Sequence, residues 1–391
     1  MKHHTGLILA AVGTGAFMSA LDGSVVNATL PVIRRALGSD VATIEWVVTV
    51  YLLVVSGLLL SFGRLGDLRG HKRIYVLGFG IFIASSLLCG LAPTAGALVA
   101  GRAVQAVGGA MLFANSAAIL TTNFPPERRG RTLGLQATMT YLGLMAGPSL
   151  GGLLASWLGW RAIFYINLPI GLLALALSLR FIPADRPVRQ VERFDLPGAA
   201  AFMAGLTLLL LALNRGHAWG WASLQTLGAF VMAFALLATF IALERRVPAP
   251  MLDLSLFSRR LFSVATASAV LNYICLYSIT FLLPFYLIQG RGLGSAQAGL
   301  ILTAQPLVMA IVAPLSGALS DRIGSRVLSS VGMLILACGL AFLSRLGVAS
   351  PVAHVVAGLA LAGLGTGIFI SPNTSALMGA APRGRQGIAS G

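Results

Sequence analysis

Long apolar runs alternate with short polar segments along almost the whole chain. A membrane-spanning helix needs about 20 mostly apolar residues, and each run approaches or exceeds that length. The runs must be helical because a span has to satisfy its own backbone hydrogen bonds, and they are too long and too uniformly apolar for barrel strands. The pattern predicts roughly twelve spans, over residues 6–30, 45–63, 74–92, 96–120, 133–156, 162–182, 198–214, 224–243, 261–287, 298–318, 327–346 and 352–378.

Composition agrees with an all-α integral membrane protein. Hydrophobic residues make up 57% of the 391 residues and charged residues only 10%, whereas an ordinary soluble domain has about 25% charged residues. The 46 glycines suit helices that pack closely in lipid.

The net charge of +16 reflects topology rather than nucleic-acid binding. If the amino terminus is cytoplasmic, the basic residues outside the membrane are only Arg34, Arg35, Arg161, Arg215, Arg291 and Arg345. Arg102 falls within a span, and all other basic residues lie in cytoplasmic segments, which is the positive-inside bias. We therefore expect a multi-pass protein of the cell (inner) membrane with its amino terminus in the cytoplasm, surrounded by lipid and without a nucleic-acid partner.

Several kinds of chemistry are excluded. Cys89, Cys275 and Cys338 lie inside predicted spans without metal-ligand spacing, so neither a metal site nor a disulfide framework is expected. The chain contains no Walker sequence for ATP-driven pumping and no coupled Ser, His and Asp set for hydrolysis. An enzyme is not expected.

The chain contains an internal repeat. The stretch "GRLGDLRGHKR" at 63–73 returns as "GALSDRIGSRV" at 317–327, and "RGR" at 129–131 returns at 383–385. Both pairs have the same offset, so the chain has two halves of similar internal order, as in transporters built from repeated bundles.

The repeat predicts the domain organisation. Residues 1–182 form a six-helix bundle, residues 183–258 a linker with two extra transmembrane helices, and residues 259–391 a second bundle with about four helices. The first half places two spans after its "RGR", whereas the second stops shortly after its own. We therefore expect the last two helices to be missing from this sequence.

Several stretches carry a family resemblance. The double G-x-L-x-D-x-x-G motif resembles the cytoplasmic loop motif of the major facilitator superfamily. "LDGSVVNATLP" at 21–31, "LVAGRAVQAVGGA" at 98–110, "GLMAGPSLGG" at 143–152 and "WRAIFYINLPIG" at 160–171 resemble motifs of its fourteen-helix drug/proton antiporters, the EmrB/QacA type.

The sequence departs mildly from these motifs at Ser24, Thr29 and Ala106. The resemblance covers the whole chain and implies a major facilitator fold of two six-helix bundles plus two inserted helices.

Asp22 is the first candidate for proton coupling. A charged side chain at the membrane centre costs roughly 2.5–3.5 kcal/mol on insertion scales and usually faces a cavity or a partner. A carboxyl that loads and releases a proton is what a proton-coupled exchanger needs, and the resemblance associates the aligned aspartate with proton or cation handling. In the alternative, Asp22 sits shallow in its helix and is hydrogen-bonded to Ser24 or Asn27 for structure.

Arg102 is the second candidate, since the family motif assigns its counterpart to proton coupling. A guanidinium stays charged and can bias a nearby carboxyl toward ionisation. The alternative is an arginine near a helix end whose charged group reaches the membrane surface.

Two groups of residues are candidates for gating. A glycine-rich face of the fifth helix, kinked by a proline, allows a close helix contact, although pure packing uses the same residues. Carboxylates at cytoplasmic helix ends can pair with basic side chains or with a facing helix amino terminus, although an ordinary solvated loop has the same composition. The gating set is Gly63, Asp67, Gly70, Arg73, Gly143, Gly147, Pro148, Gly151, Gly152, Gly317, Asp321 and Gly324.

Polar and aromatic residues within the spans are candidates for lining a substrate cavity, although most aromatic residues in such helices simply pack. They are Asn27, Phe113, Asn115, Tyr141, Asn272, Tyr273, Tyr277, Phe281, Gln305 and Asn373.

These features predict a monomeric, proton-coupled antiporter that exports lipophilic, cationic drugs by alternating access, a role connected with antibiotic resistance. Its partner is a small-molecule lipophilic substrate, and it uses no cofactor other than protons as the coupling ion. Two alternatives stay open. One is a narrow-specificity transporter of a metabolite or natural product, and the other is a non-transporting membrane receptor or scaffold.

Overall fold

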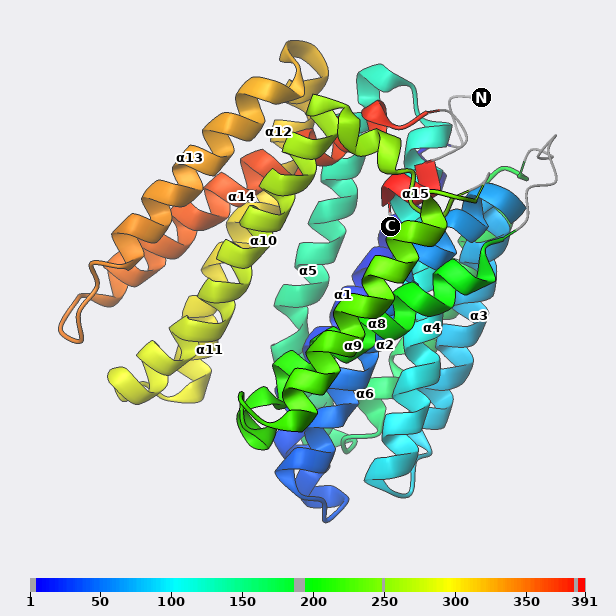
Figure 1. The fold of residues 1–391 in the computed structure, drawn as a ribbon. Helices are drawn as coiled ribbons and strands as arrows, with labels where there is room; N and C mark the ends of the chain where they lie inside the picture. The colour runs from blue at the N-terminus through cyan, green and yellow to red at the C-terminus, as the bar shows by residue number, and fades with distance from the viewer. Residues whose placement is uncertain (1–4, 186–193, 248–249, 383–385, 391) are drawn as a thin grey trace. The chain divides into compact units, whose positions relative to one another are not determined.

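The computed structural model describes residues 5–185, 194–247, 250–382 and 386–390, and every regular element within them is helical (Figure 1). The predicted all-α membrane class is confirmed, because eleven of the described helices are long and apolar enough to cross a membrane. The span predicted at 133–156 corresponds to α5 (Arg129–Trp157), which is 29 residues long but falls outside these eleven. Its glycine, threonine and serine residues lower its hydropathy. Several predicted features lie outside the described residues, namely the basic residues Lys2, Arg186, Arg189 and Arg193 and the second "RGR" at 383–385.

The described residues divide into two compact units that do not follow the order of the chain. The first contains the described parts of Met1–Ala28, Leu120–Leu153 and Ser258–Ala381, and the second those of Thr29–Ile119, Leu154–Phe257 and Pro382–Gly391. The division into domains predicted from the sequence repeat remains a prediction.

The first unit contains most of α1 and α5 together with the helices of the second sequence half from α10 to α14. Its elements are α1 (Thr5–Ala36), η1 (Pro126–Arg128), α5, α10 (Arg260–Phe285), η3 (Tyr286–Gly290), α11 (Ser295–Leu302), α12 (Ala304–Ile323), α13 (Ser325–Leu343) and α14 (Val352–Ala380). Helix α14 packs along both α12 and α13. Its approach to α13 is close because Gly332 faces Gly365 and Gly339 faces Ala362, so small residues bring the two backbones together.

The second unit contains the remaining helices of the first half and the two inserted helices. Its elements are α2 (Val41–Arg69), α3 (His71–Gly90), α4 (Ala95–Asn123), α6 (Ala162–Tyr165), α7 (Asn167–Phe181), α8 (Leu196–Trp219), α9 (Leu224–Glu244), η2 (Leu254–Ser258) and α15 (Gln386–Ser390). Helix α3 packs against α2, α6 and α7.

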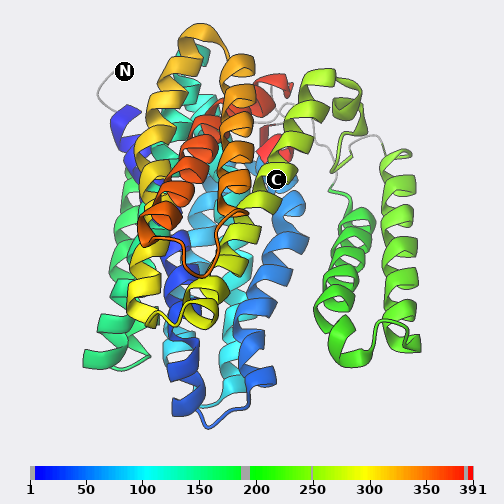
Figure 2. The same cartoon turned by 90° about the vertical axis from the view of Figure 1, so that its left-hand side faces the viewer.

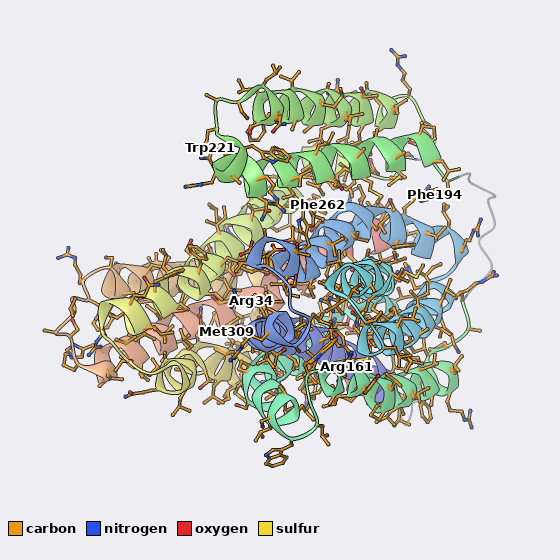
Figure 3. All side chains as sticks on the ribbon, turned by 90° about the horizontal axis from the view of Figure 1, so that it is seen from below. Arg34, Arg161, Phe194, Trp221, Phe262 and Met309 are labelled. Atoms are coloured by element: carbon orange, nitrogen blue, oxygen red, sulfur yellow. The ribbon has the colours of Figure 1, made fainter. Side chains whose placement is uncertain are left out.

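Helices α8 and α9 fall in the stretch of sequence where two extra helices were predicted, and they pack together as an antiparallel hairpin (green in Figure 2). Helix α8 begins where Asp195 accepts a hydrogen bond from the Gly198 N–H at 3.0 Å, which caps the first turn. At the turn between the hairpin helices, the ring of Trp221 lies over Gly216, where any larger residue would collide with it (Figure 3). Helix α8 also packs on α2.

The second glycine of each repeated motif joins two helices. Gly70 ends α2 and begins α3 with φ +101°, and Gly324 does the same between α12 and α13 with φ +85°. Residues with a Cβ rarely adopt these values. The motif therefore needs glycine here so that one helix can end and the next begin without an intervening loop.

Candidate functional site

The carboxylate of Asp67, near the end of α2, contacts the backbone of α15. Its Oδ1 accepts a hydrogen bond from the Gly387 N–H at 2.8 Å, and its Oδ2 accepts one from the Ile388 N–H at 3.0 Å. One helical turn earlier, Gly63 crosses Gly387 so closely that a Cβ on either residue would overlap the carbonyl oxygen of the other. The G-x-x-x-D spacing therefore places a backbone crossing and an acceptor on one face of α2. We call this contact the α2–α15 latch.

The second copy of the motif makes the same contact at α5. The Oδ1 and Oδ2 of Asp321, near the end of α12, accept hydrogen bonds from Gly130 at 2.7 Å and from Arg131 at 2.9 Å. Gly317 crosses Gly130 one turn earlier, again with no room for a Cβ. A carboxylate at the first turn of a 29-residue helix satisfies orphan N–H groups and interacts favourably with the helix dipole. We call this contact the α12–α5 latch.

These contacts show one of the partners that the sequence left open for the two aspartates. Both carboxylates bind the backbone at the start of a helix distant in sequence, and neither latch is an ordinary solvated loop, since Gly63, Gly66 and Gly317 are buried. The role of these residues in gating stays a prediction. The repeat also shifts in register, because the structural counterpart of Gly130 is Gly387, three residues beyond the position that the "RGR" echo indicates.

Asp185, which sequence reasoning missed, caps the start of α3. Gly70 at the N-cap has no side chain to bond the first turn, and Asp185 accepts hydrogen bonds from the Lys72 and Arg73 N–H groups at 3.0 Å each. The Lys72 ammonium donates to the carbonyl oxygens of Leu179 at 2.9 Å and Ile182 at 2.6 Å, at the end of α7. Lys72, within the basic run of the motif, therefore anchors α3 to the end of α7.

Helices α1 and α5 meet through the glycines of the fifth-helix motif. Gly143 lies against the Phe17 carbonyl and Gly147 against Ser24, with no space for a Cβ at either position. The Ser24 hydroxyl donates to the Leu144 carbonyl at 2.8 Å. This carbonyl would accept the N–H of residue 148 in a regular helix, but Pro148 has none. Ser24 therefore satisfies the acceptor that the proline leaves unpaired.

One member of this glycine set does not share the packing face. Gly143, Gly147 and Gly151 are buried, but Gly152 is exposed, and a Cβ there would meet nothing within 4 Å. The physical reason is rotation, because consecutive residues differ by about 100° around a helix with 3.6 residues per turn. The prediction that all four glycines lie on one side of the helix was wrong for Gly152.

Asp22 is 1% exposed and lies near the middle of α1. The structural alternative invoked Ser24 or Asn27 as its partner. The hydrogen of the Ser24 hydroxyl is donated to Leu144, and Asn27 is exposed. Asp22 lies near the middle of α1 rather than in its outer third, and a purely structural hydrogen bond of its carboxyl stays an open alternative. Its role in proton coupling stays a prediction.

Arg102 on α4 is also 1% exposed, so the alternative of a side chain reaching the surface is wrong. Its guanidinium donates to the Val47 carbonyl at 3.2 Å and to Gln105 Oε1 at 2.6 Å, and it lies 4.2 Å from the centre of the Tyr51 ring. A planar cation with several donors and a polarisable face suits all three contacts.

Gln105 extends this contact into a buried polar network. Its amide nitrogen donates to the Ser86 hydroxyl at 2.8 Å, which also accepts from Asn167 on α7 at 3.4 Å. The network joins four helices of the second unit. Ser86, Gln105 and Asn167 were missed from the sequence, although polar residues within apolar spans are the signal that identifies such positions.

The candidate cavity residues fall into different environments. Asn115 is fully buried, and its amide nitrogen donates to the Phe62 carbonyl on α2 at 3.2 Å and to the Met111 carbonyl on its own helix at 2.9 Å. Its role in lining a substrate cavity stays a prediction. Asn373 donates to the Ala265 carbonyl at 3.0 Å and joins α14 to α10. Asn272 and Gln305 are buried, and each has one amide atom, Oδ1 and Nε2 respectively, without a hydrogen-bond partner.

The aromatic candidates differ mainly in exposure. Tyr141 is buried against Met309, Ala310 and Ala313. Phe113, Tyr273, Tyr277 and Phe281 are exposed, as is the polar candidate Asn27. An apolar groove of about 290 Å³ lies between α10, η3 and α13 in the first unit, lined by Ser278, Ile279, Leu282, Leu283, Tyr286, Leu340, Leu343, Ser344 and Leu346. None of the cavity candidates lines this groove.

Residues 12–391 match the model of the Major Facilitator Superfamily. The chain belongs to this superfamily. It is 36% identical to the riboflavin transporter RibZ of Clostridioides difficile, over 97% of this chain and 82% of the relative. It is also 36% identical to the multidrug resistance protein Stp of Mycobacterium tuberculosis, over 98% of this chain and 72% of the relative.

The facilitator fold is also seen in a solved structure of low sequence identity. The human organic anion transporter MFSD10 (TETRAN) superimposes with a TM-score of 0.68 at 18% identity, over 99% of this chain and 88% of that chain. The superfamily and the matched relatives place this chain among membrane transporters of small molecules rather than enzymes.

Proposed function

We propose that this chain is a proton-coupled antiporter that exports lipophilic, cationic compounds by alternating access, as a monomer with its amino terminus in the cytoplasm. The fourteen-helix drug/proton antiporter type is the proposed subgroup. Relatives named for multidrug resistance and for export of tetracenomycin C support export rather than uptake. The observation that carries the proton coupling is the buried carboxyl of Asp22 in the middle of an otherwise apolar spanning helix.

In the proposed cycle, Asp22 takes a proton from outside, which favours the inward-facing state. Substrate binding and proton release inside then favour the return. One charge that crosses 100 mV provides about 2.3 kcal/mol, and a tenfold concentration ratio costs about 1.4 kcal/mol. Each net charge exchanged therefore sustains roughly a fortyfold gradient. Arg102 contributes by holding α4 to α2 within a buried network, so that a change of state moves these helices together.

The two latches support the alternating-access part of the proposal. Each holds a helix start through hydrogen bonds to a single carboxylate and a backbone crossing between glycines. Such contacts involve few side chains, so separating them does not disrupt a packed apolar core. The unpaired amide atoms of Asn272 and Gln305 are the proposed polar contacts for substrate.

The test is transport in proteoliposomes with an imposed pH gradient, using a fluorescent lipophilic cation and Asp22→Asn. We expect wild-type protein to accumulate the cation against its gradient and the variant to lose gradient-driven transport while still equilibrating the cation. Undiminished proton-driven accumulation by Asp22→Asn would refute the assignment.

The matched riboflavin transporter supports a second candidate, a transporter of narrow specificity for a metabolite. Riboflavin is neutral and polar, so its transport is readily distinguished from transport of a lipophilic cation. Transport of riboflavin, with no transport across a panel of cations, would favour this candidate over multidrug export.

A further inference from the structure

His71, the first residue of α3, lies inside the α2–α15 latch. Its Nδ1 is 2.9 Å from the side-chain oxygen of Asn115, and its Nε2 is 3.3 Å from Oδ1 of Asp67. The imidazole therefore bridges α4 and α2 at the carboxylate that holds α15. The side chain of His71 is 15% exposed and that of Asp67 is 1% exposed, so water reaches the imidazole more readily than the carboxylate.

The orientation of the Asn115 amide determines whether the Nδ1 atom of His71 carries a hydrogen. The Asn115 amide nitrogen donates to two backbone carbonyls, those of Phe62 and Met111. A carbonyl oxygen can only accept, so the atom of Asn115 that faces His71 is its oxygen, which is also only an acceptor. The Nδ1 of His71 must therefore carry a hydrogen. Gly66 makes this contact possible, because a Cβ there would overlap the Asn115 side-chain oxygen.

The second ring nitrogen faces a carboxylate. With Nδ1 protonated, a neutral imidazole presents a lone pair at Nε2, and this lone pair would oppose the lone pairs of Asp67 Oδ1. The contact at 3.3 Å is favourable only with a proton between Nε2 and Oδ1. Imidazole is the stronger base of the two groups in model peptides, so this proton resides on the imidazole.

We infer that His71 is a proton-binding site of the α2–α15 latch and that the latch closes on α15 only while His71 is an imidazolium. Loss of the proton turns an attractive contact with Asp67 into a repulsive one, and the carboxylate then leaves the position from which it accepts the Gly387 and Ile388 N–H groups. The latch therefore weakens as the pH on its side of the membrane rises. This inference requires neither a particular substrate nor a proton at Asp22.

The charges of the other groups around His71 favour its imidazolium form. Asp67 faces it from α2, and Asp185 approaches it from the segment after α7, where it caps α3. Lys72 and Arg73 follow on its own helix, but the Lys72 ammonium is held by carbonyl oxygens at the end of α7. Helix α4 contributes the neutral Asn115, and α15 contributes backbone N–H groups.

The α12–α5 latch provides an internal control. It has the same geometry at Asp321, but the repeat places Ser325 where the first latch has His71, and Ser320 where the first has Gly66. The Ser320 hydroxyl donates to the Gly317 carbonyl at 2.8 Å within its own helix. The position equivalent to His71 therefore cannot titrate, and the second latch has no pH dependence from this source.

The test is hydrogen–deuterium exchange of the purified full chain over a pH series, with rates corrected for intrinsic exchange. In wild-type protein, we expect protection of the Gly387 and Ile388 amides to fall about tenfold between about pH 6 and pH 8.5, the range in which histidine titrates. Protection of the Gly130 and Arg131 amides stays constant. His71→Gln keeps an N–H donor but cannot titrate, so its protection at Gly387 and Ile388 does not change with pH, and His71→Arg gives high protection at every pH.

Three results would overturn the inference. One is equal pH dependence at both latches in wild-type protein, a comparison that does not depend on whether any variant folds. Another is an unchanged pH dependence of Gly387 and Ile388 protection in His71→Gln, and the third concerns Asp22→Asn. If His71 is the proton-binding site, Asp22→Asn keeps the pH dependence of protection at Gly387 and Ile388. Loss of this pH dependence in Asp22→Asn would assign it to Asp22 instead. Loss of transport in Asp22→Asn with an intact latch profile separates this inference from the proposed function.

Discussion

The contact between Ser24 and Leu144 yields a prediction that can be tested by a double-mutant cycle. Pro148 removes the N–H that would bond the Leu144 carbonyl in a regular helix, and the Ser24 hydroxyl replaces it at 2.8 Å. Ser24→Ala leaves this carbonyl without its donor. Side-chain hydrogen bonds between membrane helices contribute about 0.6 kcal/mol on average and about 1.7 kcal/mol at most, so we expect a loss of about 1 kcal/mol in the free energy of unfolding.

The same substitution has a different effect once the proline is gone. Pro148→Ala restores an N–H that bonds Leu144 within α5, so Ser24 becomes redundant. We expect Ser24→Ala to cost nearly nothing in the Pro148→Ala background, which gives a coupling energy of about 1 kcal/mol between the two positions. Unfolding in mixed micelles of increasing SDS content measures each free energy, and fluorescent-substrate efflux follows function in parallel.

Ser24→Thr is the matched control, because it keeps the hydroxyl and we expect it to unfold like the wild type. The reasoning is refuted if Ser24→Ala destabilises the Pro148→Ala protein as much as it destabilises the wild type. Ser24 would then act through packing against Gly147 rather than through the carbonyl that the proline leaves unpaired.

Three further predictions concern the latches and the buried network. Gly130→Ala forces a Cβ into the carbonyl oxygen of Gly317, so we expect this variant to lose about 1–3 kcal/mol of stability. The control Gly152→Ala places its Cβ in open space and leaves the free energy of unfolding unchanged. Equal losses of stability in the two variants would contradict the crossing geometry. Arg102→Lys keeps the charge but cannot make the contacts to the Val47 carbonyl, Gln105 and the Tyr51 ring together. We therefore expect thermal denaturation in detergent to show a loss of about 2 kcal/mol. A variant as stable as the wild type would argue against a structural network. Asp185→Ala removes the cap of α3, and we expect it to cost about 1 kcal/mol in the same assay and to increase amide exchange at Lys72 and Arg73; unchanged exchange at these two amides would show that the cap is not needed.

The positions of the helices were predictable from the sequence because hydropathy and helix formation are local properties. The span predicted at 224–243 is observed as Leu224–Glu244, and that at 352–378 as Val352–Ala380. The repeated motif was also visible, and its two aspartates make equivalent contacts. These predictions needed only the residues of one segment at a time.

The partners of the polar residues were not predictable in the same way. Asn115 was assigned to a cavity because it is a polar residue in an apolar span, and such residues serve a substrate or a structural network equally well. Only the structure shows that its amide nitrogen holds Phe62 and that its oxygen faces His71. The sequence could not indicate this choice, because these contacts depend on the rotation and crossing of three separate helices.

The sequence by itself determined that the chain is an all-helical membrane protein of repeated design, since the length, apolarity and motif spacing of each segment are written within that segment. The tertiary structure decided which backbone each aspartate holds, which hydroxyl replaces the hydrogen bond missing at Pro148, and why His71 must carry a proton. Each of these depends on atoms from helices distant in sequence that meet within hydrogen-bond distance, and a hydrogen bond forms only where both distance and direction are right.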